Sequence, residues 1–292
     1  MRHLTRTALA WATGLGVLWL AILPVQAGVS LKGDVEQGAL VVGKTSPDAQ
    51  VTLDGRKISV SSKGYFAIAF DRDHGPSAIL KIKTPDGKSE TEHLKVAPRH
   101  WQIQRITGVA RKYVTPPPED LIRIKRESKL KKASRPCNTD TDWFAEKFIW
   151  PASGPISGIY GSQRIFNGEP RNPHFGVDIA APEGAPIVAP ANGIIRLAEP
   201  DMFYEGGLVF IDHGQGVFSQ MLHMSKIYVK KGQRVHQGDL IGKVGMKGRA
   251  TGPHLHWGML WCGTRVDASL MVPGVGAEGV QPGTKVKSVK PN

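Results

Sequence analysis

The chain has 292 residues, 40% of them hydrophobic and 22% charged, which is the composition of a globular protein. Its 34 glycines and 21 prolines argue against a bundle of long helices and favour short strands joined by turns. The formal net charge of +13 indicates anionic partners without naming one.

Residues 1–27 have the layout of a signal peptide. A basic start, MRHLTR, precedes an uncharged apolar run over residues 8–23, and the sequence VQA supplies a cleavage site that ends at Ala27. The alternative is an uncleaved membrane anchor formed by residues 8–23. We expect an exported protein that starts near Gly28, so its charge points to anionic envelope polymers or lipid surfaces rather than to nucleic acid.

Residues 28–98 are predicted to form a small β-sandwich of immunoglobulin-like type. Asp54-Gly55 and Asp86-Gly87 each stand between two alternating runs, which is a strong hairpin signal. No cluster of chemically active residues occurs there. We therefore expect this accessory domain to position or shield a site rather than to catalyse.

Residues 99–150 are predicted to be a linker with one basic helix. A run of prolines ends at Pro118, Glu119 and Asp120 follow, and lysines and arginines gather toward the far end, an order that suits the helix dipole. We interpret the basic face as solvated. The alternative is a weak contact with an anionic envelope surface.

Residues 151–273 are predicted to form a compact all-β domain of short runs separated by glycine turns, and residues 274–292 a disordered tail rich in Gly, Pro and Lys.

Cys137 and Cys262 are the two cysteines of the chain, and an oxidising compartment would let them pair. Such a bridge would close a long loop, worth about 4–5 kcal/mol in the chain-entropy model. Two free thiols are the alternative.

Two stretches of the last domain carry the candidate chemistry. In NPHFGVDIA the glycine and proline argue against a helix, and on an extended segment His174 and Asp178 face the same way, with Gly176 leaving space between them. In GPHLHW, His254 and His256 flank one leucine on a predicted strand, so both rings face one side.

Two imidazoles on an otherwise apolar strand need polar partners. Two histidines and one carboxylate are a ligand set of catalytic zinc, with the fourth position left to water. No His-Glu-x-x-His occurs to supply a glutamate base, so a histidine should carry the proton. His223 and whichever of His254 and His256 is not a ligand are the candidates. His213 and His236, both in predicted turns, are interpreted as structural or surface residues.

In this order, PHFGVDIA, MLHMS and GPHLHW resemble the motifs of lysostaphin-type (LytM-like) zinc metallopeptidases, which cut peptide cross-links of bacterial peptidoglycan. The likeness covers about residues 150–272. It implies a β-sheet peptidase domain of the duplicated hybrid motif (barrel-sandwich hybrid) type with one zinc ion. By the same resemblance, His174, Asp178 and His256 bind the metal, His254 is a catalytic histidine, and His223 orients water or stabilises the oxyanion.

The resemblance also implies a function. We expect a periplasmic D,D-endopeptidase that acts on stem peptides during cell-wall remodelling and has no nucleic-acid partner. Many relatives have a tyrosine where this chain has Met221 and a proline where it has Ala268, departures that bear on substrate preference more than on the metal. The alternative function is a non-catalytic activator of other cell-wall hydrolases. The stretch VKKGQRVHQGDLIG is shared with lipoyl and biotinyl carriers, so it indicates a fold rather than a function.

Overall fold

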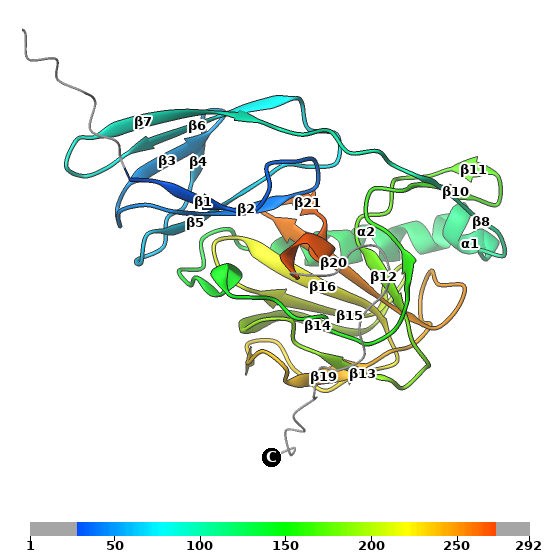
Figure 1. Ribbon diagram of the computed structural model, residues 1–292. Helices are drawn as coiled ribbons and strands as arrows, with labels where there is room; N and C mark the ends of the chain where they lie inside the picture. The colour runs from blue at the N-terminus through cyan, green and yellow to red at the C-terminus, as the bar shows by residue number, and fades with distance from the viewer. Residues whose placement is uncertain (1–27, 273–292) are drawn as a thin grey trace, which may run out of the picture.

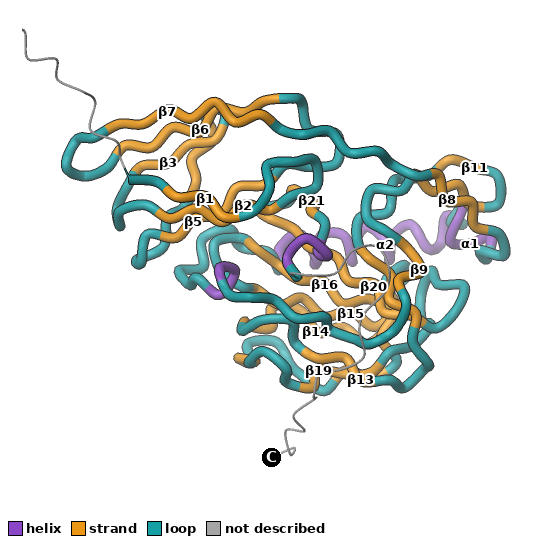
Figure 2. Tube along the Cα trace, in the orientation of Figure 1, coloured by secondary structure: helices purple, strands orange, loops and turns teal. Residues whose placement is uncertain are grey.

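The computed structural model describes residues 28–272 (Figure 1). The predicted signal peptide at 1–27 and the predicted tail at 274–292 lie outside the described residues. Strands far exceed helices in the described part, as Figure 2 shows, so the expectation of an all-β protein is confirmed. No helix in residues 28–272 is long and apolar enough to cross a membrane.

The N-terminal part is a sandwich of two sheets, with strand orders β1-β2-β5 and β4-β3-β6-β7. The strands are β1 (Ser30–Lys32), β2 (Leu40–Lys44), β3 (Gln50–Leu53), β4 (Arg56–Ile58), β5 (Tyr65–Ala69), β6 (Ser77–Lys83) and β7 (Ser89–Lys95). Burial alternates strictly along β6, as expected of a strand with one face on the core. Asp54 and Gly55 both have positive φ, at 49° and 80°, which is the backbone of a tight two-residue hairpin turn, and β6 and β7 pair around Gly87, so both predicted hairpins are confirmed.

The linker contains the predicted helix and also a strand that was not predicted. The helix α2 (Pro118–Ala133) starts with Pro118 at its first turn, carries Glu119 and Asp120 there, and ends with lysines. A short helix, α1 (Arg111–Val114), precedes it. The strand β8 (Ile103–Ile106) pairs in parallel with β10 (Gln163–Phe166), far along the chain, and β11 (Glu169–Pro170) completes this small sheet.

The helix α2 is not simply a solvated basic element. Arg123 donates from Nη2 to Asp201 Oδ2 at 3.1 Å, and Lys131 forms an ion pair with Glu205. The buried carboxylate of Glu127 accepts a hydrogen bond from the backbone N–H of Phe203 at 2.8 Å. These contacts dock the polar helix onto the β14–β15 hairpin, which corrects the interpretation of a wholly solvated face.

The C-terminal part is built on an eight-stranded sheet of order β18-β14-β15-β16-β20-β12-β9, with β21 on β20. Its strands are β9 (Ile156–Gly158), β12 (Val177–Ala180), β14 (Gly193–Met202), β15 (Gly206–Asp212), β16 (Val217–Met224), β18 (Arg234–Val235), β20 (His254–Trp261) and β21 (Thr264–Val266). A second sheet contains β13 (Pro186–Val188), β19 (Leu240–Lys243) and β17 (Lys226–Ile227). Every residue of β15 is buried, so the main sheet is covered on both faces at this strand: Val209 and Ile211 belong to the large core, and Leu208 and Phe210 to a second, smaller cluster.

The sandwich packs against the C-terminal part near β20 and β21, at the upper left of Figure 1. Asp267, at the start of the 3₁₀ helix Ala268–Met271, donates its backbone N–H to Gly38 O at 2.7 Å and pairs through its carboxylate with Arg99 at 2.9 Å. Arg72 donates to Gly161 O at 2.6 Å. Hydrogen bonds of Gly38 and Arg72 therefore hold the sandwich to the C-terminal part, and Arg99 at the start of the linker adds an ion pair.

Cys137 and Cys262 are both free thiols in the structure, so the predicted disulfide is not formed in it. They are nonetheless neighbours, because a Cβ atom built on Gly216 would lie 2.3 Å from Cys262 Sγ and 3.3 Å from Cys137 Sγ. Burial, followed by the hydrogen bond with Cys137, raises the pKa of the Cys262 thiol to about 12. The fold thus brings the linker cysteine to the cysteine of the last domain.

Candidate metal centre

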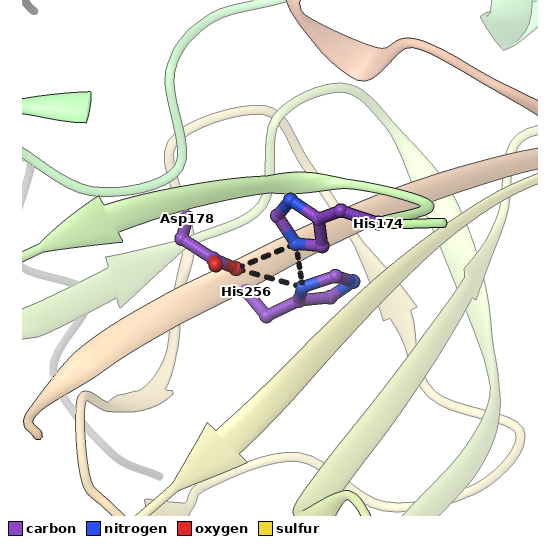
Figure 3. Close-up of side chains that lie close together, drawn as sticks. All are labelled: His174, Asp178 and His256. Atoms are coloured by element: carbon purple, nitrogen blue, oxygen red, sulfur yellow. Dashed lines mark hydrogen bonds and ion pairs between the residues drawn. The ribbon is translucent and has the colours of Figure 1, made fainter. Parts of the chain in front are cut away.

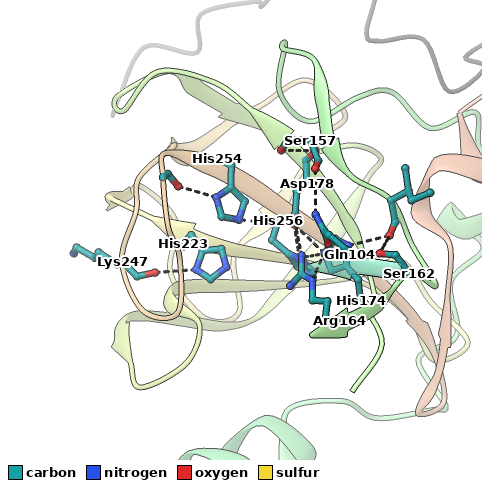
Figure 4. Close-up of polar contacts among 12 residues, drawn as sticks. Gln104, Ser157, Ser162, Arg164, His174, Asp178, His223, Lys247, His254 and His256 are labelled. Carbon is teal, nitrogen blue, oxygen red and sulfur yellow. Dashed lines mark hydrogen bonds and ion pairs between the residues drawn. The ribbon is translucent and has the colours of Figure 1, made fainter. Parts of the chain in front are cut away.

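Two neighbouring antiparallel strands bring the predicted ligands together. In the register of β12 and β20, Asp178 lies directly opposite His256, and His254 lies opposite Ala180. His174 comes from the loop that precedes β12, rather than from the strand itself. The predicted strand through His254 and His256 is confirmed, and both rings lie on the side of Asp178 (Figure 4).

Three side-chain atoms converge on one point (Figure 3). Asp178 Oδ1 lies 2.9 Å from His174 Nε2 and 2.8 Å from His256 Nδ1, and the two nitrogens are 2.9 Å apart. His174 and Asp178 are buried, with 1% and 6% of their surface exposed. The structure therefore brings together the three residues that the family resemblance implied as a ligand set.

The protonation pattern of this cluster fits a bound cation. His174 Nδ1 donates to Ile159 O at 3.0 Å, because a carbonyl only accepts, and this contact turns Nε2 toward Asp178 and His256. Burial would raise the pKa of Asp178, but the charges and hydrogen bonds of His174 and His256 outweigh it and hold that pKa well below 3.8. Burial lowers the pKa of His256 to about 4. The ionised carboxylate and the neutral imidazole are the forms in which Asp178 and His256 would bind a metal.

Arg164 on β10 supports the carboxylate, and sequence reasoning did not assign it a role. Its Nη2 lies 2.6 Å from Asp178 Oδ2, and its Nε lies 3.3 Å from Gln104 Oε1 on β8. This contact occupies one carboxylate oxygen and leaves Oδ1 facing the histidines. The only signal in the sequence was that Arg164 belongs to SGIYGSQRI, which resembles the entry strand of the family.

Two glycines make room for the cluster. A Cβ atom on Gly176 would lie 2.5 Å from His256 Nε2, and one on Gly158 would lie 2.5 Å from Asp178 Oδ2. Real Cβ atoms do not approach other atoms so closely. The prediction that Gly176 leaves space is confirmed, although the ring that uses the space is that of His256.

A second pair of histidines borders the first cluster (Figure 4). The rings of His223, on β16, and His254 have centroids 4.7 Å apart, and His254 Nε2 lies 3.8 Å from Asp178 Oδ1. Each ring donates from Nδ1 to a backbone carbonyl at 2.8 Å, His223 to Lys247 O and His254 to Gly252 O. Both Nε2 atoms are thereby left as hydrogen-bond acceptors. Burial, then the charges of His254 and His256, lowers the pKa of His223 to about 3.

The histidines lie where two clefts meet. The larger cleft, about 510 Å³, touches His174, His223 and His256. The smaller, about 320 Å³, touches Asp178, His223 and His254. Gln104, Ile106 and Val109 of the linker line the smaller cleft, whereas no described residue of the sandwich lines either. The sandwich therefore does not shield the site in this structure.

The remaining histidines of the domain are structural or exposed, as predicted. His213 is fully buried and donates from Nδ1 to Asn192 O at 2.7 Å. Its Nε2 lies 2.9 Å from Ser219 Oγ, which in turn accepts a hydrogen bond from Trp257 Nε1 at 3.2 Å. His236 has 75% of its side chain exposed.

The comparisons with known proteins agree with this geometry. The model of Peptidase family M23 matches residues 172–268. A solved structure from Pseudomonas aeruginosa, assigned to peptidase family M23, is 30% identical, with a TM-score of 0.57 over 88% of this chain and 96% of that one.

Curated relatives match over shorter stretches. The peptidoglycan DD-endopeptidase ShyA of Vibrio cholerae is 43% identical over 96 residues, which are 33% of this chain and 22% of that protein. The cell division protein DipM of Caulobacter vibrioides is 32% identical over 169 residues, which are 55% of this chain and 26% of that protein. The chain thus spans about a quarter or less of the length of these two relatives.

Proposed function

This chain belongs to peptidase family M23, and from that premise we propose that it is a zinc-dependent endopeptidase that hydrolyses peptide cross-links of bacterial peptidoglycan. Residues 151–273 are the peptidase domain of this proposal, 28–98 the accessory domain and 99–150 the linker. The observation that carries the proposal is the convergence of His174, Asp178 and His256 on one point beside a second histidine pair.

His174 Nε2, Asp178 Oδ1 and His256 Nδ1 would hold one zinc ion per chain. When bound, zinc would polarise the scissile carbonyl and lower the pKa of water. The hydrogen bond from His174 to Ile159 O fixes the tautomer that binds, and Arg164 fixes the orientation of the carboxylate. These contacts support a preformed site.

His254 and His223 would orient the attacking water molecule and accept its proton. Since both donate from Nδ1 to backbone carbonyls, the neutral form of each ring presents at Nε2 a lone pair that can orient a water molecule and accept its proton. We assign proton transfer to His254, whose Nε2 is 3.8 Å from Asp178 Oδ1. His223 would orient the water, and would serve the oxyanion only once Nε2 has gained a proton.

The bond cut is proposed to be the D,D cross-link between stem peptides, on the strength of relatives named peptidoglycan DD-endopeptidases. The predicted signal peptide supports export to the periplasm as part of the same proposal. Weak contact of the basic linker with an anionic envelope surface also stays a proposal.

Mass spectrometry of muropeptides tests this function. Purified peptidoglycan would be incubated with the mature protein, with the protein plus chelator, and with chelator followed by excess zinc. We expect cross-linked dimers to decrease, the decrease to stop with chelator, and zinc to restore it. Unchanged dimers with the zinc-loaded protein would refute the proposal and favour the alternative, a non-catalytic activator of other hydrolases.

A further inference from the structure

The larger cleft beside the metal centre is lined by basic side chains. Four arginines face it, against one carboxylate, that of Glu205, whose Oε1 is paired with Lys131 of α2. The four are Arg164, Arg171, Arg249 and Arg265. A cleft of this kind favours a substrate that carries negative charge.

Only two of the four arginines are neutralised by the chain itself. Arg164 is paired with Asp178, and Arg171 with Glu169. Within residues 28–272, the side chains of Arg249 and Arg265 form no ion pair and no hydrogen bond, although the charge of Glu205 acts on Arg249 from a distance. Arg265 is exposed, but Arg249 is half-buried, and its unpaired donors face the cleft.

Arg249 is held rigidly. Its guanidinium lies over the rings of Phe166 and Tyr204, with its central carbon 5.2 and 4.9 Å from the two centroids. Its backbone N–H donates to Tyr204 O at 2.8 Å. The preceding Gly248 has φ of 75°, and a Cβ atom there would lie 2.5 Å from Gly206 N, so the loop packs too closely for any other residue.

The position of Arg249 is at the reacting end of the cleft. It lines both clefts, and His223 does the same. Burial lowers the pKa of Arg249, which reflects the cost of keeping a charge out of water without a partner. A planar guanidinium matches the two oxygens of a carboxylate, and stacking on aromatic rings leaves its N–H edge free for such a contact.

We propose that Arg249 binds a free carboxylate of the peptide substrate close to the scissile bond and thereby makes the enzyme select stem peptides that carry this group. The inference rests on the proposed function and adds a specificity residue to it. Because Arg249 is outside the three-residue metal cluster, its loss should change which substrate is cut rather than whether metal binds.

The test compares two substrates with the zinc-loaded protein. One is a cross-linked stem-peptide dimer with free carboxylates, and the other is the same dimer with its carboxylates converted to primary amides. We expect kcat/KM to favour the free dimer by about tenfold or more, and Arg249→Gln to reduce this ratio about tenfold. The ratio does not depend on the fraction of folded enzyme, so a partly unfolded variant remains informative.

Arg234→Gln is the matched control. Arg234 also stacks on an aromatic ring, with its central carbon 5.3 Å from the centroid of Trp143, but it lines neither cleft. We expect this variant to keep the wild-type ratio. An unchanged ratio in Arg249→Gln, or an equal loss on both dimers, would overturn the inference.

Calorimetry with an uncrosslinked stem tetrapeptide separates this inference from the proposed function. The free tetrapeptide should bind the wild-type protein about tenfold more tightly than its amide, and Arg249→Gln should remove the difference. Because binding requires no turnover, the carboxylate site is tested even if no cross-link is cut. Equal affinity of the wild-type protein for both peptides would contradict the inference.

Discussion

Asp178 and His256 face each other across two adjacent antiparallel strands, with Asp178 Oδ1 2.8 Å from His256 Nδ1. Strand pairing places their backbones in register, so only the loop that carries His174 has to be positioned separately. The geometry of the site therefore depends on the pairing of β12 with β20 and on the residues that contact the ligand side chains.

Gly176→Ala should weaken zinc binding. The new methyl group would lie 2.5 Å from His256 Nε2, so the ring or the backbone would have to move. We expect zinc affinity to fall about 10- to 100-fold, measured by competition with a chromophoric chelator. Gly75→Ala is the control, because nothing lies within 4 Å of a Cβ atom there, and an equal loss in that variant would contradict the explanation.

Arg164→Gln should also lower zinc affinity, by about tenfold or more, because it removes the 2.6 Å contact that fixes Asp178 Oδ2. The same chelator competition measures it. Arg196→Gln is the matched control, since Arg196 pairs with the buried carboxylate of Asp212 at 2.8 Å and lines neither cleft. If Arg164→Gln bound zinc as tightly as the control, Arg164 would not be a positioning residue.

His213 should make the fold sensitive to acid. Burial lowers its pKa to about 4, below the 6.5 of the unfolded chain, so the unfolded state takes up a proton first as the pH falls. The contribution of neutral His213 to the free energy of unfolding is fully present above pH 6.5. It is lost as the pH falls from 6.5 to 4, by about 3 kcal/mol in total. Urea unfolding of the metal-free protein across this range should show a shallower pH dependence for His213→Gln than for wild type.

The exposed His236 supplies the control for that series. His236→Gln should have the wild-type pH dependence, because 75% of the side chain is in water. A His213→Gln variant that lost stability with pH as steeply as wild type would show that other groups account for the acid sensitivity.

Mild oxidation should join Cys137 to Cys262, since both sulfurs border Gly216. Because the disulfide closes a long loop, the oxidised protein should unfold at a higher temperature than the reduced one. Its free energy of unfolding should rise by at most about 4–5 kcal/mol. Thiol titration of the denatured protein and thermal unfolding with and without reductant measure the two effects. Two titratable thiols after oxidation would rule the bridge out, and Cys137→Ser should remove any effect of reductant.

Local patterns were enough to predict how the candidate residues face, whereas the choice of His174, Asp178 and His256 as the ligand set came from the resemblance to a known family. The two-residue period of a strand placed His254 and His256 on one side, and glycine and proline around His174 excluded a helix. Both features depend only on neighbouring residues, and the structure reproduces them. The hairpins at Gly55 and Gly87 were predictable for the same reason.

The supporting contacts were not predictable, because they join distant parts of the chain. Arg164 reaches Asp178 from a strand that pairs in parallel with β8 of the linker, and short parallel pairs leave no period in the sequence. The docking of α2 depends on Glu127, an acidic residue in a basic helix. From the sequence this residue is expected to face water, because Phe203, whose backbone N–H it accepts from, lies far along the chain. Likewise, nothing next to His213 in the sequence indicates that its ring will bond to Ser219, whose hydroxyl also accepts from Trp257.

The most direct test of the account is to measure zinc content and hydrolysis of a cross-linked muropeptide dimer on the same samples of wild type, His174→Ala and His254→Ala. The account predicts one zinc per wild-type chain and the loss of both zinc and activity in His174→Ala. In His254→Ala it predicts a zinc content near that of the wild type and an activity reduced by about 100-fold or more. A fully active His254→Ala, or a His174→Ala protein that still holds one zinc ion per chain, would contradict it.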